Sequence, residues 1–173
     1  MEAPRAESDE MPKKIGYSSL ADGAELSKSD FHFDVLGSID ECSAAIALAK
    51  SLHQEAGTRA LLTEIQKDLS FIMGAVAGMQ GGEAYFQERL TWIEGQIIGL
   101  KGVVVLPKAF ILPGENSLEA SLDLARTFAR RAERALAKYA EAAAGFDQNA
   151  LQYLNRVSTV LYLHELKSRN EGA

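Results

Sequence analysis

The chain has 173 residues and a formal net charge of −6, with 47% hydrophobic and 24% charged residues. This composition is typical of one globular domain and excludes a disordered or collagen-like chain. The acidic balance argues against nucleic acid or an anionic membrane as a partner. No apolar run approaches the roughly 20 residues of a membrane-spanning helix. The single cysteine, Cys42, suits a reducing compartment, so we expect a cytoplasmic protein.

The first part of the chain is polar and lacks the pattern of a helix. Residues 1–12 contain two prolines, and we expect a disordered tail there. Residues 15–30 are rich in Gly, Ser and Asp, which predicts an ordered loop or a short extended segment. We therefore expect the folded unit to occupy residues 13–173, with 13–30 as its N-terminal loop.

Five later stretches have apolar residues spaced three or four apart, which is the pattern of amphipathic helices. We expect these helices at about 34–56, 59–80, 84–100, 118–143 and 148–169. We interpret Gly57 as the stop of the first helix and Thr58 as the N-cap of the second. Asn116 or Ser117 is expected to cap the fourth helix, with Glu119 in its first turn.

The segment 101–117 differs from its neighbours because two short apolar runs each end in a proline, at Pro107 and Pro113. Proline removes a backbone donor, so neither run fits inside a sheet. We expect a long connection that crosses the end of the bundle.

Gly145 is expected to end the fourth helix, and Asp147 is expected to cap the fifth. The predicted fold is an all-α bundle of five helices.

The fourth predicted helix carries a row of arginines. Arg126, Arg130 and Arg134 are four residues apart and therefore share one face, with Arg131 beside them. Arginine presents a planar fork that suits phosphate and carboxylate oxygens. Two interpretations remain open: an exposed basic face paired with acids of a neighbouring helix, or a site for a polyphosphate anion.

Other polar residues interrupt apolar faces. Asp40 and Glu41 lie in the first predicted helix. They are interpreted either as solvated residues or as acids that face an arginine across an interface. Asn155 lies in a mostly apolar stretch, where its amide needs partners in a network or a ligand. No histidine follows a Glu by three residues, and the sequence has no Cys/His cluster, Walker loop or G-x-S-x-G motif. We therefore predict no metal site.

Several of these segments resemble one known family. The segments FILPGENS, ARTFARRAERAL and ALQYLNRVSTVLY are similar, in order and spacing, to segments of the PduO-type ATP:cob(I)alamin adenosyltransferases. YSSLADGAELSKSD and GSIDECSAAIALA resemble the N-terminal segments of that family, so the likeness runs from about residue 15 to about 165. The resemblance implies a ferritin-like five-helix bundle in a homotrimer with active sites between subunits. It also implies transfer of the 5′-deoxyadenosyl group from ATP to cob(I)alamin, with release of triphosphate.

The resemblance also implies roles for particular residues. The implied ATP contacts form two groups. Those in an N-terminal nucleotide loop at 13–30 are Ser18, Ser19 and Lys28, and those on the last two helices are Arg130, Arg131, Glu133, Arg134 and Asn155. Arg130, Arg126 and Asp40 are implied as catalytic, and Asp40 would pair with Arg126 across the subunit boundary. Phe110 would lie beneath the corrin, with Asp40 also in the cobalamin site. The implied substrates are ATP with Mg²⁺ and cobalamin, and a cobalamin-dependent enzyme or a reductase is an implied partner.

One segment departs from the family pattern. Where the family has T-K-T-G-D-x-G, residues 10–16 read EMPKKIG, so Lys13 and Lys14 replace the first glycine and the aspartate. This difference leaves open a non-catalytic homologue that binds a corrinoid or a nucleotide and stores, delivers or senses the cofactor. A bundle whose arginines serve only in packing between subunits is a third interpretation.

Overall fold

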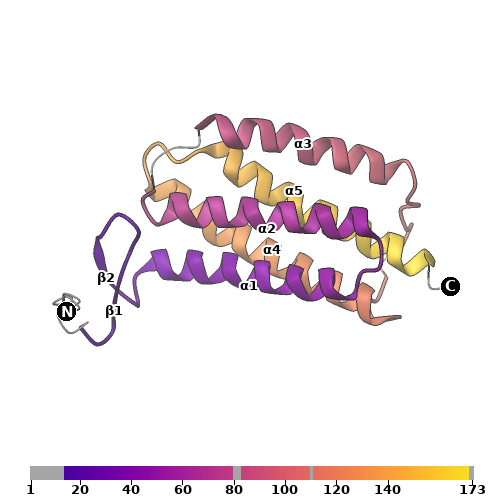
Figure 1. Ribbon diagram of the computed structural model, residues 1–173, viewed down its shortest axis with the longest axis horizontal. Helices are drawn as coiled ribbons and strands as arrows, with labels where there is room; N and C mark the ends of the chain where they lie inside the picture. Colours follow the sequence, from indigo (N-terminus) through magenta and orange to yellow (C-terminus); the bar gives the residue numbers. More distant parts are fainter. Residues whose placement is uncertain (1–13, 80–82, 110, 172–173) are drawn as a thin grey trace, which may run out of the picture.

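The computed structural model describes residues 14–79, 83–109 and 111–171, and within them five long helices lie side by side (Figure 1). The elements are β1 (Tyr17–Ser19), β2 (Glu25–Ser27), α1 (Phe31–Leu52), α2 (Ala56–Val76), α3 (Glu83–Lys101), α4 (Ser117–Ala142) and α5 (Gln148–Glu171). The predicted all-α bundle of five helices is confirmed. The predicted tail at 1–12 lies outside the described residues, as do Lys13 and Phe110.

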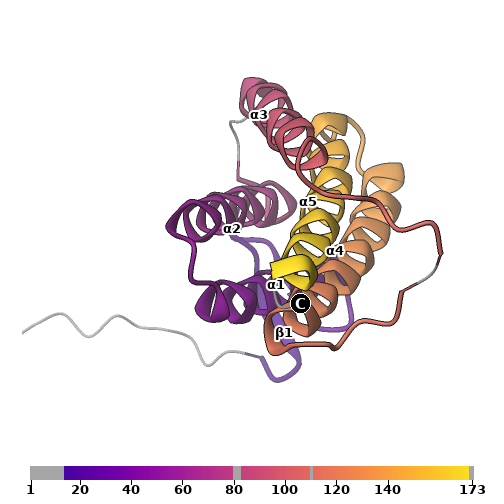
Figure 2. The same cartoon turned by 90° about the vertical axis from the view of Figure 1, so that its right-hand side faces the viewer.

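The helices pack as a series of neighbours. α2 packs on α1, α1 on α4, α4 on α5, and α5 on α3. Seen from one end, α5 lies between α3 and α4 (Figure 2). The face of α4 that packs inward is made largely of small side chains, because Ala125, Ala129 and Ala132 are fully buried. Small side chains let α1 and α5 approach the backbone of α4 closely, and this holds the opposite face of α4 outward.

The connection between α1 and α2 differs from the prediction. Gly57 and Thr58 lie in the first turn of α2, so the assignment of Gly57 as a stop and Thr58 as an N-cap was wrong. The turn instead uses His53, whose extended backbone ends α1 and whose Nδ1 accepts a hydrogen bond from the Glu55 amide at 3.2 Å. The Thr58 hydroxyl donates to the Glu55 carboxylate at 2.9 Å and is not available as a cap.

The other helix ends follow local capping chemistry. Asn116 Oδ1 accepts from the Glu119 amide at 2.8 Å, which confirms Asn116 as the cap of α4. Asp147 Oδ1 accepts from the Asn149 amide at 2.8 Å at the start of α5, as predicted. Asp30 caps α1 in the same way, so this helix begins at Phe31 and not near residue 34. These short polar side chains satisfy amide donors that the first turn of a helix leaves unpaired.

The ordered loop or short extended segment predicted at 15–30 contains a β-hairpin. β1 and β2 pair antiparallel, with Tyr17 opposite Ser27, beyond the end of the bundle where α1 begins (Figure 1). The Asp22 amide in its turn donates to the Ala77 carbonyl at 3.3 Å, at the end of α2. Gly78 has a φ of +86°, and a Cβ there would lie 2.6 Å from Asp22 Oδ2. The position of the hairpin therefore depends on a glycine at the end of α2.

The predicted long connection between α3 and α4 is confirmed. Residues 102–116, as far as they are described, contain no helix or strand and pass around one end of the bundle (Figure 2). Arg169 of α5 anchors this connection, because its guanidinium donates to the Leu112 carbonyl at 3.0 Å and to Glu119 Oε1 at 2.8 Å. Arg169 also pairs with Glu115 at 3.1 Å. The part of the connection that follows Phe110 is thus held against α4 and α5.

A buried carboxylate joins three helices. Asp68 of α2 is fully buried and accepts hydrogen bonds from the Tyr85 hydroxyl at 2.5 Å and from Arg89 Nε and Nη2 at 2.9 and 2.7 Å. It also accepts from the hydroxyl of the fully buried Tyr153 of α5. The Arg89 guanidinium lies 3.9 Å over the Trp92 ring. This network links α2 to α3 and α5.

We predict that Asp68→Ala destabilises the fold by about 3–5 kcal/mol, because it leaves a largely buried guanidinium without its partner. Urea unfolding at equilibrium measures this change. Glu64→Gln is the matched control, because Glu64 also pairs with Arg89, at 3.7 Å, but from a more exposed position. Equal midpoints for the two variants would contradict a structural role for the network.

We predict that Gly78→Ala loosens the hairpin and leaves the bundle folded. A left-handed backbone costs an L-residue about 1–2 kcal/mol, and the new methyl group would press on Asp22. Amide hydrogen exchange should become faster at 17–27 and stay unchanged in the bundle. Gly37→Ala is the control, since a Cβ at Gly37 meets nothing within 4 Å. Unchanged exchange in the hairpin of Gly78→Ala would show that Gly78 does not set its position.

Candidate functional site

The arginine row lies on the face of α4 opposite its buried alanines. Arg130 and Arg134 are exposed and form no ion pair with the described part of the chain. Arg126 is partly buried one turn before them. α4 therefore presents two guanidinium groups whose donors are available to an anion.

Arg131 differs from its neighbours because it has a partner in the same chain. It forms an ion pair with Glu41 of α1, and its guanidinium carbon lies 5.2 Å from the centroid of the Phe128 ring. Asp40, the next residue to Glu41, is exposed and has no ion pair within the described residues. Of the two acids singled out in the sequence, one is thus paired across α1 and α4, and the other faces solvent.

Asn155 belongs to a hydrogen-bond network beside the arginine row. Its Nδ2 donates to Glu133 Oε1 at 2.6 Å, which joins α5 to α4. Its Oδ1 accepts from Arg156 Nη1 at 3.4 Å, and Arg156 Nε lies 3.4 Å from Glu94 on α3. These contacts fix the orientation of the Asn155 amide and of the Glu133 carboxylate next to the exposed guanidinium groups.

The remaining predicted ATP contacts lie on and beside the hairpin. Ser18 is partly buried in β1, Ser19 is exposed, and Lys28 is exposed just before α1. No hydrogen bond or ion pair between described residues connects them to the arginine row. The stretch of α1 from Phe31 to Glu41 alone spans about 15 Å. One chain therefore carries the predicted ATP contacts as two separate groups.

Arg126 meets two acids that the sequence did not single out. Its Nε donates to Asp123 Oδ1 at 3.0 Å, its Nη2 also bonds Asp123, and its Nε lies 3.5 Å from Glu165 Oε2. Glu165 of α5 is buried, and its Oε2 has no hydrogen-bond partner. A carboxylate within an apolar helical stretch is the same signal that drew attention to Asn155, so the sequence could have indicated it.

These residues border a small cavity of about 310 Å³. Its lining comes from the connection between α3 and α4, from α4 and from α5, and consists of Ala109, Ile111, Pro113, Asp123, Arg126, Tyr162 and Glu165. Ala109 and Ile111 flank Phe110 in the sequence. Burial, with the nearby charge of Asp123, raises the pKa of Glu165 to about 7. The cavity therefore combines an apolar wall with a guanidinium and two carboxyl groups.

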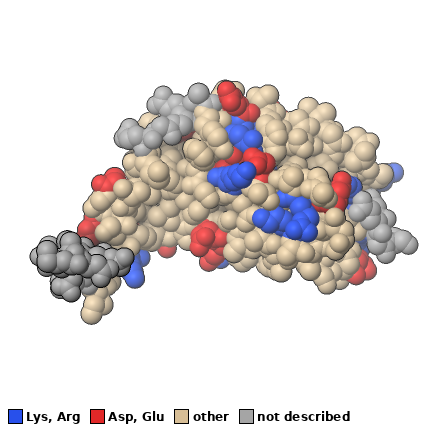
Figure 3. Space-filling model, viewed as in Figure 1, with Lys and Arg blue, Asp and Glu red and all other residues tan. Residues whose placement is uncertain are grey.

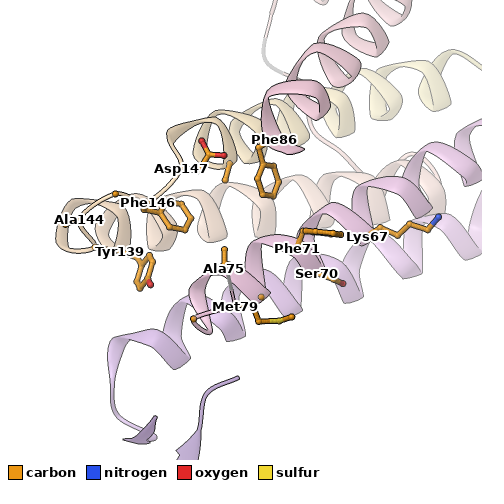
Figure 4. Close-up of a pocket in the computed structure, with 15 residues that line it drawn as sticks. Lys67, Ser70, Phe71, Ala75, Met79, Phe86, Tyr139, Ala144, Phe146 and Asp147 are labelled. Carbon is orange, nitrogen blue, oxygen red and sulfur yellow. The ribbon is translucent and has the colours of Figure 1, made fainter. Parts of the chain in front are cut away.

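A larger cavity of about 740 Å³ is drawn in Figure 4; residues near the C-terminal end of α4 line it, whereas residues near the N-terminal end of α4 line the small cavity. Phe71 and Met79 of the α2 end, Phe86 of α3, and Tyr139 and Phe146 line it, together with several small residues. None of the site residues predicted from the sequence is among its lining residues. The larger of these two cavities and the predicted site residues are thus at different places on the chain.

The charges on the visible face of the molecule are mixed. In Figure 3, basic patches lie beside acidic ones, so this face presents no uniform basic field. In the described ranges, no group of three or more His, Cys, Asp and Glu side chains is arranged to hold a metal ion. Within the same ranges, no helix combines the length and apolarity needed to cross a membrane.

Comparisons with known proteins agree over most of the chain. Residues 12–167 match the sequence model of the family described as cobalamin adenosyltransferase. The corrinoid adenosyltransferase PduO of Salmonella typhimurium is 32% identical over 152 residues, which cover 85% of this chain and 45% of that protein. A corrinoid adenosyltransferase of Mycobacterium tuberculosis is 30% identical over 170 residues, which cover 91% of this chain and 86% of that protein.

Solved structures show the same arrangement of helices. A variant of the PduO-type ATP:corrinoid adenosyltransferase of Lactobacillus reuteri, complexed with cobalamin and ATP, superposes with a TM-score of 0.79 at 26% identity and covers 88% of each chain. Another variant, complexed with ATP, gives a TM-score of 0.74 at 28% identity, over 88% of this chain and 89% of the other. This chain spans less than half the length of the Salmonella protein. Because sequence and fold agree from the hairpin to α5, the chain belongs to the cobalamin adenosyltransferase family.

Proposed function

We propose that this chain transfers the 5′-deoxyadenosyl group of ATP to cob(I)alamin, giving adenosylcobalamin and triphosphate. The observation that carries the proposal is the exposed arginine row of α4, in which Arg130 and Arg134 lack partners in their own chain. The complex of the Lactobacillus reuteri relative with cobalamin and ATP supports it.

The chemistry requires positioning and charge stabilisation and no nucleophile from the protein. Cobalt(I) attacks C5′ of ATP, the cobalt–carbon bond forms, and the C5′–oxygen bond breaks with its electron pair leaving on triphosphate. Burial raises the pKa of the Cys42 thiol to about 12, so this residue stays protonated and out of the reaction. The protein must align C5′ with cobalt and neutralise the departing triphosphate.

The two groups of predicted residues divide these tasks. The guanidinium groups of Arg130 and Arg134 would neutralise the triphosphate, which enters as a Mg²⁺ complex. Arg131, held by Glu41, would add a third guanidinium at a fixed place. The hydrogen-bonded pair of Glu133 and Asn155 would contact the nucleoside.

The hairpin group completes the site from a neighbouring subunit. Ser18, Ser19 and Lys28 would bind the phosphates, but within one chain no described hydrogen bond or ion pair joins them to the arginine row, and about 15 Å of α1 separates Phe31 from Glu41, the partner of Arg131. We therefore infer a homotrimer in which the hairpin of one subunit covers the arginine row of the next. Asp40, exposed and unpaired among the described residues, would meet Arg126 of the neighbour. A closed ring repeats this contact at every boundary.

The corrin would lie against the connection between α3 and α4. The resemblance assigns Phe110 to the face beneath the corrin, and the apolar residues on both sides of it line the small cavity beside Arg126. An apolar wall would exclude water and competing ligands from cobalt. A reductase would supply cob(I)alamin in a reducing cytoplasm, and a cobalamin-dependent enzyme would receive the product.

We predict that the purified protein forms the cobalt–carbon bond when it is mixed anaerobically with chemically reduced cob(I)alamin, ATP and Mg²⁺. The change in absorbance of the corrinoid measures this reaction. Arg130→Ala should lower kcat by about 10²–10³-fold, as for loss of one donor to a developing charge. Its melting temperature and trimer mass should remain unchanged. Arg59→Ala, an exposed arginine of α2, is the control and should retain full activity.

Two outcomes would contradict this proposal. If the wild-type protein binds ATP or corrinoid without turnover, the chain is the non-catalytic homologue suggested by its altered loop at Lys13 and Lys14. If Arg130→Ala loses stability and activity together, the arginine serves packing and not the reaction.

We predict that Asp40→Ala and Arg126→Ala each raise the KM for the corrinoid and weaken the trimer. If the two residues pair across the boundary, the double variant should be no worse than either single variant, because the second change removes nothing further. Steady-state kinetics and analytical ultracentrifugation measure both effects. An intact trimer with unaltered activity in either single variant would refute the pairing.

A further inference from the structure

Glu165 is a buried acid with an unpartnered oxygen, and the proposed function does not use it. It lies on α5, with 2% of its surface exposed, and borders the small cavity next to Arg126. Its Oε2 has no hydrogen-bond partner and lies 3.5 Å from Arg126 Nε. A buried carboxylate oxygen without a donor is costly, so its surroundings must supply a proton or a cation.

The cations near Glu165 are shared with other acids. From α4, Glu119, Asp123 and Arg126 face it, and from α5 Arg169 does. Arg169 is engaged by Glu119 at 2.8 Å and by Glu115 of the connection at 3.1 Å. Arg126 makes its hydrogen bonds to Asp123. The phenol of Tyr162 is the remaining titratable group of the cavity wall.

We propose that Glu165 is a positioning residue for Arg126: as a carboxylate it holds the guanidinium on its own chain, and with a proton bound it releases the guanidinium toward Asp40 of the neighbouring subunit. The proposal rests on the proposed function, in which Arg126 acts across the boundary. Asp123 and Glu165 are thus competitors of Asp40 for one guanidinium.

The geometry makes this competition depend on pH. Burial, followed by the charge of Asp123, raises the pKa of Glu165 to about 7. Below that pH one carboxylate of the same chain attracts Arg126, and above it two do. The cavity is large enough to hold water, so the proton can exchange with solvent. The protonated fraction of a group with a pKa of about 7 falls about tenfold between pH 6 and pH 8.

The first test is the pH profile of kcat/KM for cob(I)alamin at saturating ATP. In the wild type we expect a fall of up to about tenfold between pH 6 and pH 8. Glu165→Gln has a neutral side chain of the same shape, so its profile should be flat at the level of the acid limb. KM for ATP should not change. Glu88→Gln, an exposed residue of α3, should keep the wild-type profile.

A second variant moves the profile and does not flatten it. Asp123→Asn removes a negative charge that raises the pKa of Glu165, so the inflection should move to lower pH. A purely structural role for Glu165 would lower the melting temperature of its variants without moving the inflection. A wild-type inflection that persists in Glu165→Gln, or that stays in place in Asp123→Asn, would overturn the proposal.

A direct measurement separates this proposal from the proposed function. The Nε–H signal of Arg126 in a ¹⁵N NMR spectrum, assigned by its loss in Arg126→Ala, should shift with a midpoint near pH 7 in the wild type. It should not shift over this range in Glu165→Gln. A signal that is constant from pH 6 to pH 8 in the wild type would refute the role of Glu165 even in an active enzyme. Absence of turnover at every pH, with the shift present, would refute the proposed function alone.

Discussion

The bundle depends on one buried carboxylate. α2 packs mainly on α1 and α3 mainly on α5, so these two helices lie at the ends of the packing series. Asp68 joins them, because it accepts hydrogen bonds from Tyr85 and Arg89 of α3 and from Tyr153 of α5. Each donor loses water on burial, and the shared negative charge compensates all of them. The network therefore fixes the outer helices around α4 and α5, which carry the candidate site.

The charged residues of one chain that lack a partner support the proposed association of subunits. Arg130 and Arg134 lack an acidic partner among the described residues, whereas Asp40 lacks a basic one. In the same chain Arg131 meets Glu41, and Arg126 has two acids near it, Asp123 and Glu165. An excess of cations on α4 and a free acid on α1 are the complementary surfaces that association of identical subunits can bring together. Assembly and catalysis would then use the same residues.

Much of this structure was predictable, and the contacts that were missed are of two kinds. The five helices and the caps at Asn116 and Asp147 follow from residues close in sequence, whereas the turn at Gly57 and Thr58 was predicted wrongly because the Thr58 hydroxyl bonds the Glu55 side chain. The others join residues far apart in the chain. The hydrogen bond of Asp68 and Tyr153 joins residues 85 positions apart, and nothing local indicates it. The family resemblance assigned the arginine row but not the position of Glu165 beside Arg126, since that contact exists only when α4 and α5 pack.

The alanine face of α4 has a consequence for how chains of this kind can vary in length. Ala125, Ala129 and Ala132 are fully buried, and each residue added to a helix turns the residues after it by about 100°. An insertion or deletion inside α4 would rotate guanidinium groups toward the buried face, where Ala125, Ala129 and Ala132 now pack. The helix between Asn116 and Gly145 is thus constrained in length, while the connection before it, which has no helical register, can gain or lose residues.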